Sequence, residues 1–105
     1  MTQKQTVEIC SRVFRLVCDE FETTAERIQS PKQTNRGLPR WVIAYLLMNH
    51  TEVANHDIAQ AINRDYASLY GFRLQVIAHR QKDRLFDHQI SRLIDQLKTP
   101  AISKS

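Results

Sequence analysis

The segment ANHDIAQAINRDYASLYGFR, residues 54–73, is the part of the sequence that decides the fold. Its apolar residues recur at helical spacing on both sides of a short polar break, NRD, at residues 63–65. We therefore predict a short helix, a tight turn, and a second helix that begins with a polar turn. Two helices joined in this way form a helix-turn-helix, the unit that many proteins place in the major groove of DNA.

The two helices of this segment are each expected to have a capped start and one buried side. Asn55 is suited to cap the first helix, HDIAQAIN, and Asp65 to cap the second, which runs to about residue 82. The residues expected to face the core are Ile58, Ala59, Ala61, Ile62, Leu69, Phe72 and Val76. The residues left for the outer surface are Arg64, Tyr66, Ala67, Ser68, Tyr70 and Arg73. They gather near the N-terminal end of the second helix, the end that contacts base edges in a DNA-reading helix. A plain helical hairpin with a polar cap is the alternative interpretation.

A stretch without acidic residues, residues 27–51, precedes this segment and carries several cations. Lys32 and Arg36 belong to the polar loop SPKQTNRG, residues 30–37, and Arg40 lies in the first turn of the helix that follows. Cationic side chains on a loop can hold phosphates or enter a minor groove. Arg40 is expected to reach toward solvent or a ligand because the rest of its helix is apolar. The alternative for the loop is an ordinary solvated segment.

The rest of the sequence is also helical in pattern, without strand-like alternation or internal repeats. Residues 7–21 carry an apolar stripe at Val7, Cys10, Phe14, Val17, Cys18 and Phe21, which predicts an amphipathic helix. Thr23 and Glu26 have the spacing of a capping box, which should open a short helix that ends at Ser30 and Pro31.

Two further helices complete the expected fold. Pro39 suits the first position of the helix PRWVIAYLLMNH, which is apolar on nearly every side and should be the central one. A last helix over about residues 85–97 should bury Phe86, Ile90, Leu93, Ile94 and Leu97, and the tail at residues 99–105 should fray. The fold class is therefore all-α: a single domain over residues 1–105, with its core at about 6–98, built as a bundle of five to six helices that contains the helix-turn-helix.

Composition restricts the class of protein further. The 105 residues are 42% hydrophobic, enough for one modest core, and 15 Lys and Arg against 11 Asp and Glu give a net charge of +4. Neither a signal peptide nor a run of about 20 apolar residues is visible, so we expect a cytoplasmic protein without a membrane partner; DNA binding, where it holds, would make it nucleoid-associated. Cys10 and Cys18 lie two helical turns apart, roughly 12 Å, which is too far for a disulfide and predicts two buried, reduced thiols.

The constellations that an enzyme would need are not found in this sequence. Gly37 and Gly71 are the only glycines, so no phosphate-binding loop of the GxxxxGK[ST] type can be formed. The four histidines form no HExxH or HxH pattern, which argues against a metal site. Asp57 and Asp65 suit helix starts, and Asp83 and Asp87 suit surface ion pairs. We therefore expect no catalytic activity, no cofactor and no bound nucleotide.

Three of these stretches, in this order, resemble domain IV of the bacterial replication initiator DnaA, from about residue 7 to residue 97. EFETTAERIQSPK corresponds to the family's two short elements and basic loop. LPRWVIAYLL is similar to the family's RPRQIAMYLA, and HDIAQAINRDYASLY is similar to LPEIGRAFGGRDHTTVL. The resemblance implies a helix-turn-helix fold related to Trp repressor and a function in binding double-stranded DNA.

The resemblance also implies roles for single residues. Arg40 falls on the family's Arg after Pro, which meets the DNA, and Lys32 falls on a loop Arg that enters the minor groove. Arg64 and Asp65 match the Arg and the Asp at the start of the family's RDHTT, in the major groove.

Several positions differ from the family. Tyr66, Ala67 and Ser68 stand where the family has His, Thr and Thr, and Asn63 alone replaces two glycines. Trp41 replaces a Gln, and Leu38 replaces an Arg. Contacts to phosphates position a protein and contacts to bases specify the sequence, so we expect duplex binding with an altered or relaxed sequence preference.

These observations together predict a stand-alone DnaA-like regulator of transcription or replication, monomeric or weakly dimeric, since the family's ATPase domain is not part of this sequence. The residues expected to contact DNA are Lys32, Arg36, Arg40, Trp41, Arg64, Asp65, Tyr66, Ala67, Ser68 and Arg73. The alternative is a protein–protein adaptor that reuses the fold, with exposed Trp41, Tyr66 and Tyr70 as its contact surface. A positive surface over the loop and the helix would favour DNA, whereas an aromatic, charge-poor surface would favour a protein partner.

Overall fold

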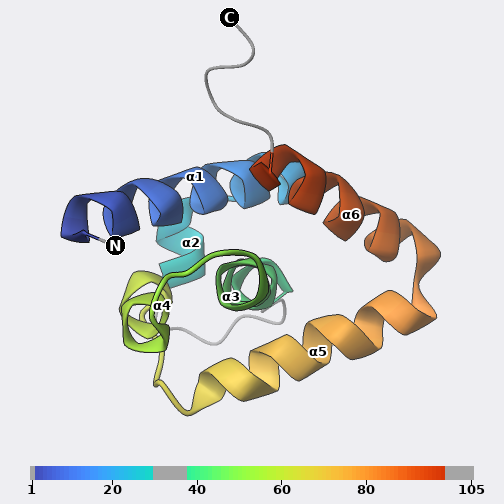
Figure 1. The fold of residues 1–105 in the computed structure, drawn as a ribbon. Helices are drawn as coiled ribbons and strands as arrows, with labels where there is room; N and C mark the ends of the chain where they lie inside the picture. Colours follow the sequence, from blue (N-terminus) through green and yellow to red (C-terminus); the bar gives the residue numbers. More distant parts are fainter. Residues whose placement is uncertain (1, 30–37, 99–105) are drawn as a thin grey trace, which may run out of the picture.

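The computed structural model describes residues 2–29 and 38–98, and these residues form six α-helices and no strand. The helices are α1 (Gln3–Phe21), α2 (Ala25–Gln29), α3 (Leu38–His50), α4 (Asn55–Ile62), α5 (Ser68–Lys82) and α6 (Arg84–Lys98). Figure 1 shows α3 end-on at the centre, with α1 and α6 above it, α4 beside it and α5 below it. The expected all-α bundle of five to six helices is confirmed.

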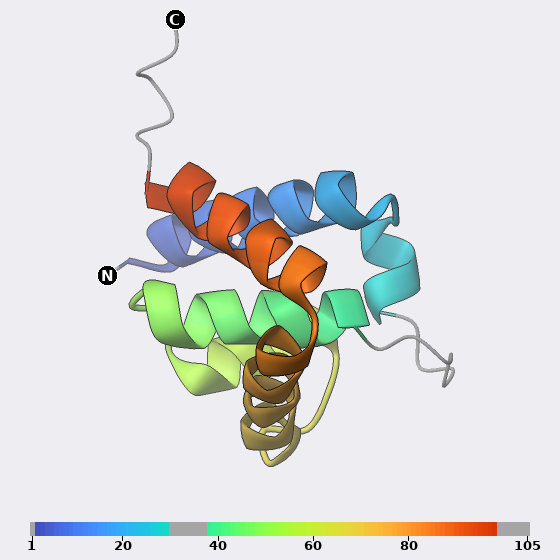
Figure 2. The same cartoon turned by 90° about the vertical axis from the view of Figure 1, so that its right-hand side faces the viewer.

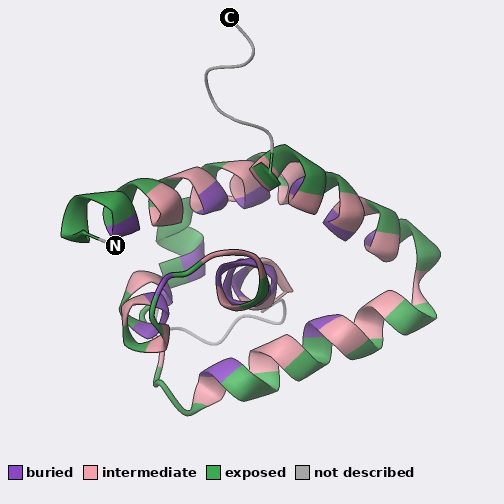
Figure 3. Cartoon of the chain, viewed as in Figure 1, coloured by how far each residue is buried: buried purple, intermediate pink, exposed green. Residues whose placement is uncertain are grey.

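Helix α3 is the centre of the core, as its sequence predicts. Tyr45 is 7% exposed, and five residues around it on this helix have no solvent exposure: Val42, Ile43, Ala44, Leu46 and Leu47. Because these residues cover all sides of the helix, α3 needs neighbours all around it, and it packs against α1, α4, α5 and α6. Figure 2 shows α3 running between α1 and α5, and Figure 3 shows it as the most continuously buried helix of this view.

Helix α1 begins at Gln3, four residues before the expected start. The Thr2 hydroxyl accepts a hydrogen bond from the Gln5 amide (3.1 Å), and the Gln5 side chain accepts one from the Thr2 amide (2.9 Å). This reciprocal pair is a capping box and extends the helix toward the N-terminus. Val13 and Val17 are buried as core residues, but Val7 is 53% exposed, so its assignment to the buried stripe is wrong. Val7 lies at the start of α1, where the helix borders an open groove rather than the core.

Two helix starts differ from the expected ones by one residue. The hydroxyl of Thr24, and not that of Thr23, accepts the amide of Arg27 (3.2 Å) at the start of α2. Helix α4 begins at Asn55 itself, after Ala54 in the capping position, so Asn55 does not cap it. The spacing of capping residues thus predicts where a helix starts to within one residue. The backbone conformation decides which of the two neighbouring residues is the cap.

The junction of α5 and α6 is built around Asp83. Its amide donates to the carbonyl of His79 (3.0 Å) and closes α5, while its carboxylate accepts the amide of Phe86 (3.1 Å) and caps α6. Asp83 was expected to form only ordinary surface pairs, and this double structural role is a correction. One residue therefore ends α5 and begins α6.

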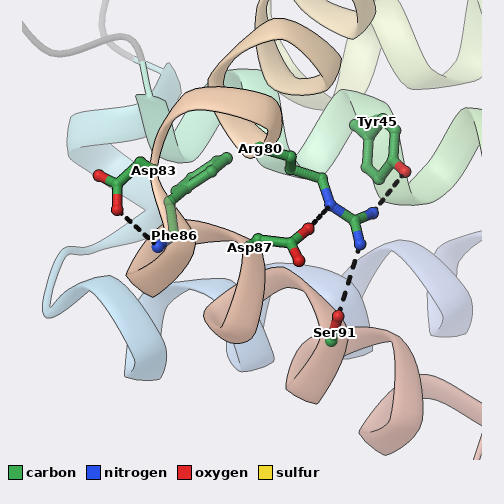
Figure 4. Close-up of polar contacts among 6 residues, drawn as sticks. All are labelled: Tyr45, Arg80, Asp83, Phe86, Asp87 and Ser91. Atoms are coloured by element: carbon green, nitrogen blue, oxygen red, sulfur yellow. Dashed lines mark hydrogen bonds and ion pairs between the residues drawn. The ribbon is translucent and has the colours of Figure 1, made fainter.

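Arg80 links three helices beside this junction (Figure 4). Its guanidinium donates to the Asp87 carboxylate (2.5 Å), to the Tyr45 hydroxyl (2.9 Å) and to the Ser91 hydroxyl (3.4 Å). The three partners lie on α3 and α6, so a charge pair expected at the surface is instead a partly buried connection in the bundle. The pKa of Arg80 is raised despite its burial, chiefly by its hydrogen bond to Asp87.

Two other expectations concern the cysteines and the membrane. Cys10 and Cys18 are free, as expected, but half-buried rather than fully buried. None of the helices in the two described ranges is both long and apolar enough to cross a membrane. The expected fraying of residues 99–105 lies outside the described residues.

Candidate nucleic-acid interface

The turn between α4 and α5 consists of residues 63–67. Asn63 ends α4 in the left-handed conformation, with φ 57° and ψ 50°, and its amide bonds to the carbonyls of Ala59 and Gln60. Residues with a Cβ atom adopt this conformation at a cost that Asn bears more easily than most. Asn63 therefore turns the chain at the end of α4 without a glycine.

Helix α2 holds this turn in place from the side. The side-chain amide of Asn63 donates to the backbone carbonyl of Gln29 (2.9 Å). In the other direction, the side-chain amide of Gln29 donates to the carbonyl of Ala61 (2.7 Å). The end of α2 and the end of α4 are therefore fastened to each other, which the sequence pattern did not reveal because the partners are more than 30 residues apart.

Helix α5 begins at Ser68, three residues after Asp65. The amide of Ser68 donates to the Asp65 carbonyl (2.9 Å) and that of Leu69 to the Tyr66 carbonyl (3.2 Å), which makes a tight turn ahead of the helix. The residue in the capping position is Ala67, which has no side chain that could cap. The expectation that Asp65 caps α5 is therefore wrong: its backbone carbonyl makes the bond. Tyr66 and Ala67 lie in the turn, and Ser68 is the first residue of the helix.

The inner side of α5 packs against the core as expected. Leu69 and Val76 are buried, and Phe72 is half-buried and stacks on Trp41 with ring centroids 6.5 Å apart. Trp41 was expected to share an exposed aromatic surface with Tyr66 and Tyr70. It packs against the core instead, so this part of the prediction is wrong, and a direct contact between Trp41 and DNA is limited to the part of its ring that stays exposed.

The outer side of α5 is aromatic and almost free of charge. Tyr66, Tyr70 and Leu74 are 59%, 65% and 61% exposed and follow one another at a spacing of four residues. Ala67, Gly71 and Ala78 are also exposed, and Arg73 is the only charged residue between positions 66 and 78. Arg73 is half-buried, and its Nε is buried without a hydrogen-bond partner among the described residues. We call residues 70, 74 and 78 of α5, together with Tyr66 of the preceding turn, the outer stripe of α5.

Arg40 is buried, with 6% of its surface exposed, which contradicts the expectation that it reaches toward solvent. Its Nε donates to the carbonyl of Ile28 (2.9 Å) and satisfies a carbonyl in the last turn of α2. The sequence could not reveal this role because the partner is a backbone atom 12 residues away. Burial, and then the charge of Arg64, lower the pKa of Arg40. Two cations therefore lie close together beside the turn.

The remaining site residues fall into two groups. Arg64 is half-buried beside Asp65, Tyr66, Ala67 and Ser68, and its Nη1 donates to the carbonyl of Asn63 (2.7 Å). Lys32 and Arg36, in the basic loop, lie outside the described residues. The structure thus brings residues 64–68 together at the N-terminal end of α5, with Asp65, Tyr66 and Ala67 exposed and Arg64 and Ser68 half-buried. Arg73 lies further along α5.

Within the described part of the chain, no group of three or more His, Cys, Asp and Glu side chains is arranged to hold a metal ion. No model of a known protein family and no curated protein matches the sequence.

Proposed function

We propose that this chain binds duplex DNA through the α4–α5 unit, in the manner of a DnaA domain IV-like helix-turn-helix. The observation that carries this proposal is the turn at residues 63–67, in which Asp65, Tyr66 and Ala67 are exposed. The turn stands at the N-terminal end of α5 and is fastened to α2 by Asn63 and Gln29. A reading helix needs its first residues exposed and its position fixed by the rest of the fold, because base edges are contacted from that end.

The side chains of this unit divide into those proposed to contact base edges and those proposed to contact phosphates. Tyr66, Ala67 and Ser68 would face the base edges, while Arg64 and Arg73 would hold phosphates with the loop residues Lys32 and Arg36. Arg40 contributes indirectly. It binds the last turn of α2, and α2 holds the turn between α4 and α5 in place. As a regulator of transcription or replication, the protein would work in the cytoplasm, on the nucleoid.

The test is a selection of bound sequences from a random duplex library, followed by fluorescence anisotropy on the selected and on unselected duplexes. We expect binding to any duplex at low salt, and tighter binding to the selected sequence. A protein without measurable affinity for any duplex at low salt would contradict the proposal.

A second function, contact with a protein partner, is favoured by the outer stripe of α5. Exposed patches of aromatic and aliphatic side chains mark interaction sites, and Tyr is enriched at protein interfaces whereas Lys, Glu and Asp are depleted. Tyr66, Tyr70 and Leu74 have this composition and are all more than half exposed. The chemistry of this stripe supports a protein partner as readily as it supports a DNA groove.

The substitution Leu74→Lys separates the two functions, because it adds a cation at the centre of the outer stripe. If α5 faces DNA, the variant binds duplexes more tightly and the slope of log affinity against log salt steepens by about 0.9, the value for one further phosphate contact. If α5 faces a protein, duplex affinity does not respond. Val7→Lys is the matched control, since Val7 is similarly exposed but lies on α1.

A further inference from the structure

A groove of about 470 Å³ opens between α1, α2 and α4, three helices that pack against one another on the left of Figure 1. The described residues around it are Gln3, Thr6, Val7, Cys10, Ser11, Phe14, Ala25, Gln29, Asp57, Gln60 and Ala61. Those from α1 recur every three to four residues and so form one face of its first turns. The groove is thus separate from the outer stripe of α5.

The groove has the size and the walls of a small-molecule site. Small-molecule sites have volumes of about 300–1,000 Å³ and are lined mainly by apolar side chains with a few polar groups. Val7, Cys10 and Phe14 supply an apolar wall from α1. On the side of α4, Ala61 contributes only a methyl group and so occupies little of the groove. Burial raises the pKa of Cys10, so its thiol stays neutral at pH 7 and belongs to the apolar wall.

Asp57 is the only charged side chain among the described residues that line the groove. It lies in the first turn of α4, and a quarter of its side chain is exposed. Its negative charge also raises the pKa of Cys10, so its field acts inside the groove. On the solvent side it lies 3.4 Å from His56, whose side chain is 71% exposed, and an ion pair of this exposure is weak. The carboxylate therefore remains accessible to a cation from within the groove.

We propose that this groove binds a small organic cation, an ammonium group carried on an apolar body. The ammonium group would pair with the Asp57 carboxylate, and the apolar body would lie against Val7, Cys10 and Phe14. A neutral molecule of the same shape would have the apolar contacts without the ion pair, and an anion would meet the carboxylate unfavourably. This site includes neither residues 64–68 nor the outer stripe of α5, and its test requires no DNA.

The test uses three probes that share a phenyl ring and differ in charge: 2-phenylethylamine, 2-phenylethanol and 3-phenylpropionate. Each is titrated to millimolar concentration into the ¹⁵N-labelled full chain at pH 7. We expect the amine to shift the amide signals of Cys10, Gln60 and Ala61, with an affinity about tenfold higher than that of the alcohol; tenfold corresponds to a free energy of about 1.4 kcal/mol. The propionate should bind most weakly.

Two kinds of variant make the assignment specific. Asp57→Asn should lower the affinity of the amine to that of the alcohol. Asp19→Asn removes an exposed carboxylate of α1 away from the groove and should leave the affinity of all three probes unchanged. Ala61→Leu should fill the groove and abolish binding of all three probes. If this variant does not fold, Val7→Phe narrows the groove from its exposed rim and should weaken all three. Absence of shifts at these amides, equal affinity for amine and propionate, or a preference for the amine that survives Asp57→Asn would overturn the proposal.

Discussion

At the scale of single residues, two polar side chains from elsewhere in the chain satisfy backbone carbonyls at the end of α2. Arg40 holds the carbonyl of Ile28, and Asn63 holds the carbonyl of Gln29. Both carbonyls belong to the last turn of α2, where the helix itself offers no partner. The two side chains therefore fasten α2, the shortest of the described helices, to α3 and to the turn between α4 and α5.

Arg40→Met should destabilise the protein, although a surface arginine would tolerate the change. Methionine keeps the apolar stem but leaves the buried carbonyl of Ile28 without its donor, which costs about 1–3 kcal/mol. Urea unfolding of the variant measures the loss. Arg27→Met, at an exposed position of α2, is the matched control and should change the free energy of unfolding by less than about 0.5 kcal/mol. Equal stability of the two variants would show that the hydrogen bond from Arg40 to the carbonyl of Ile28 does not stabilise the fold.

His50 should make the protein less stable in acid. Burial, and then the charges of Lys98 and Arg80, lower the pKa of His50 in the folded state below its usual value of about 6.5. Between these two pKa values the unfolded chain binds the proton and the folded chain does not. The free energy of unfolding therefore falls as the pH drops from about 7 toward 5.

The measurement is urea unfolding at several pH values for the wild type and for His50→Gln. The difference in stability between the two should shrink as the pH falls, because the variant lacks the group that takes up the proton. His88→Gln, which removes an exposed histidine from α6, is the matched control. A difference that stays constant over this range would show that His50 does not contribute to the acid sensitivity.

At the scale of secondary-structure elements, the sequence predicts which helices form better than it predicts where they begin. Helix α3 is an almost continuous apolar run and α6 has a strong apolar periodicity, and both helices are found within one residue of the expected bounds. The start of α5 is wrong by two residues, because Ala67 and not Asp65 occupies the capping position and Asp65 uses its backbone carbonyl. The turn of the candidate site could be predicted from the local pattern. The burial of Arg40 could not, since it depends on a long-range contact to a backbone carbonyl.

The start of α6 offers a direct test of a cap that the sequence analysis missed. Asp83→Ala should lower the free energy of unfolding by about 0.5–2 kcal/mol, because the Phe86 amide loses its acceptor. Asp83→Ser keeps a capping oxygen and should recover most of the loss. Thermal or urea unfolding of the two variants provides the comparison, and equal losses would mean that the carboxylate acts through its charge or its pair with His79 and not as a cap.

The turn before α5 should determine the sequence preference of the proposed DNA complex. Ser68→Ala removes a hydroxyl that can bond to a base edge, and Tyr66→Ala removes a ring that is mostly exposed. We expect each change to weaken binding to the selected duplex by about 1–3 kcal/mol and to leave binding to unrelated duplexes nearly unchanged. Anisotropy titrations with both duplexes at one salt concentration measure the two affinities. An equal loss on every duplex would instead assign these residues to the phosphate backbone.

At the scale of the whole molecule, charge is distributed unevenly around the proposed interface. The chain carries a net charge of +4, yet the outer stripe of α5 has no charged residue. Among the described residues, two cations available to phosphates flank the outer stripe of α5: Arg64 in the turn and Arg73 on the helix. Lys32 and Arg36 belong to the loop sequence and lie outside the described residues. Arg40 is not available to phosphates because its side chain is buried. Any attraction to DNA must therefore come from the edges of the interface, with uncharged side chains at its centre.

This distribution predicts a moderate dependence of duplex affinity on salt. With roughly three to four phosphate contacts, log affinity should fall against log salt concentration with a slope of roughly −3 to −4, since each neutralised phosphate contributes about −0.9. Anisotropy titrations from low to physiological salt measure the slope. Arg64→Gln and Arg73→Gln should each reduce its magnitude by about one, with little effect on sequence preference. A slope near zero, with binding intact, would mean that the uncharged stripe of α5 provides the affinity, and contact with a protein partner would then be the better account of this surface.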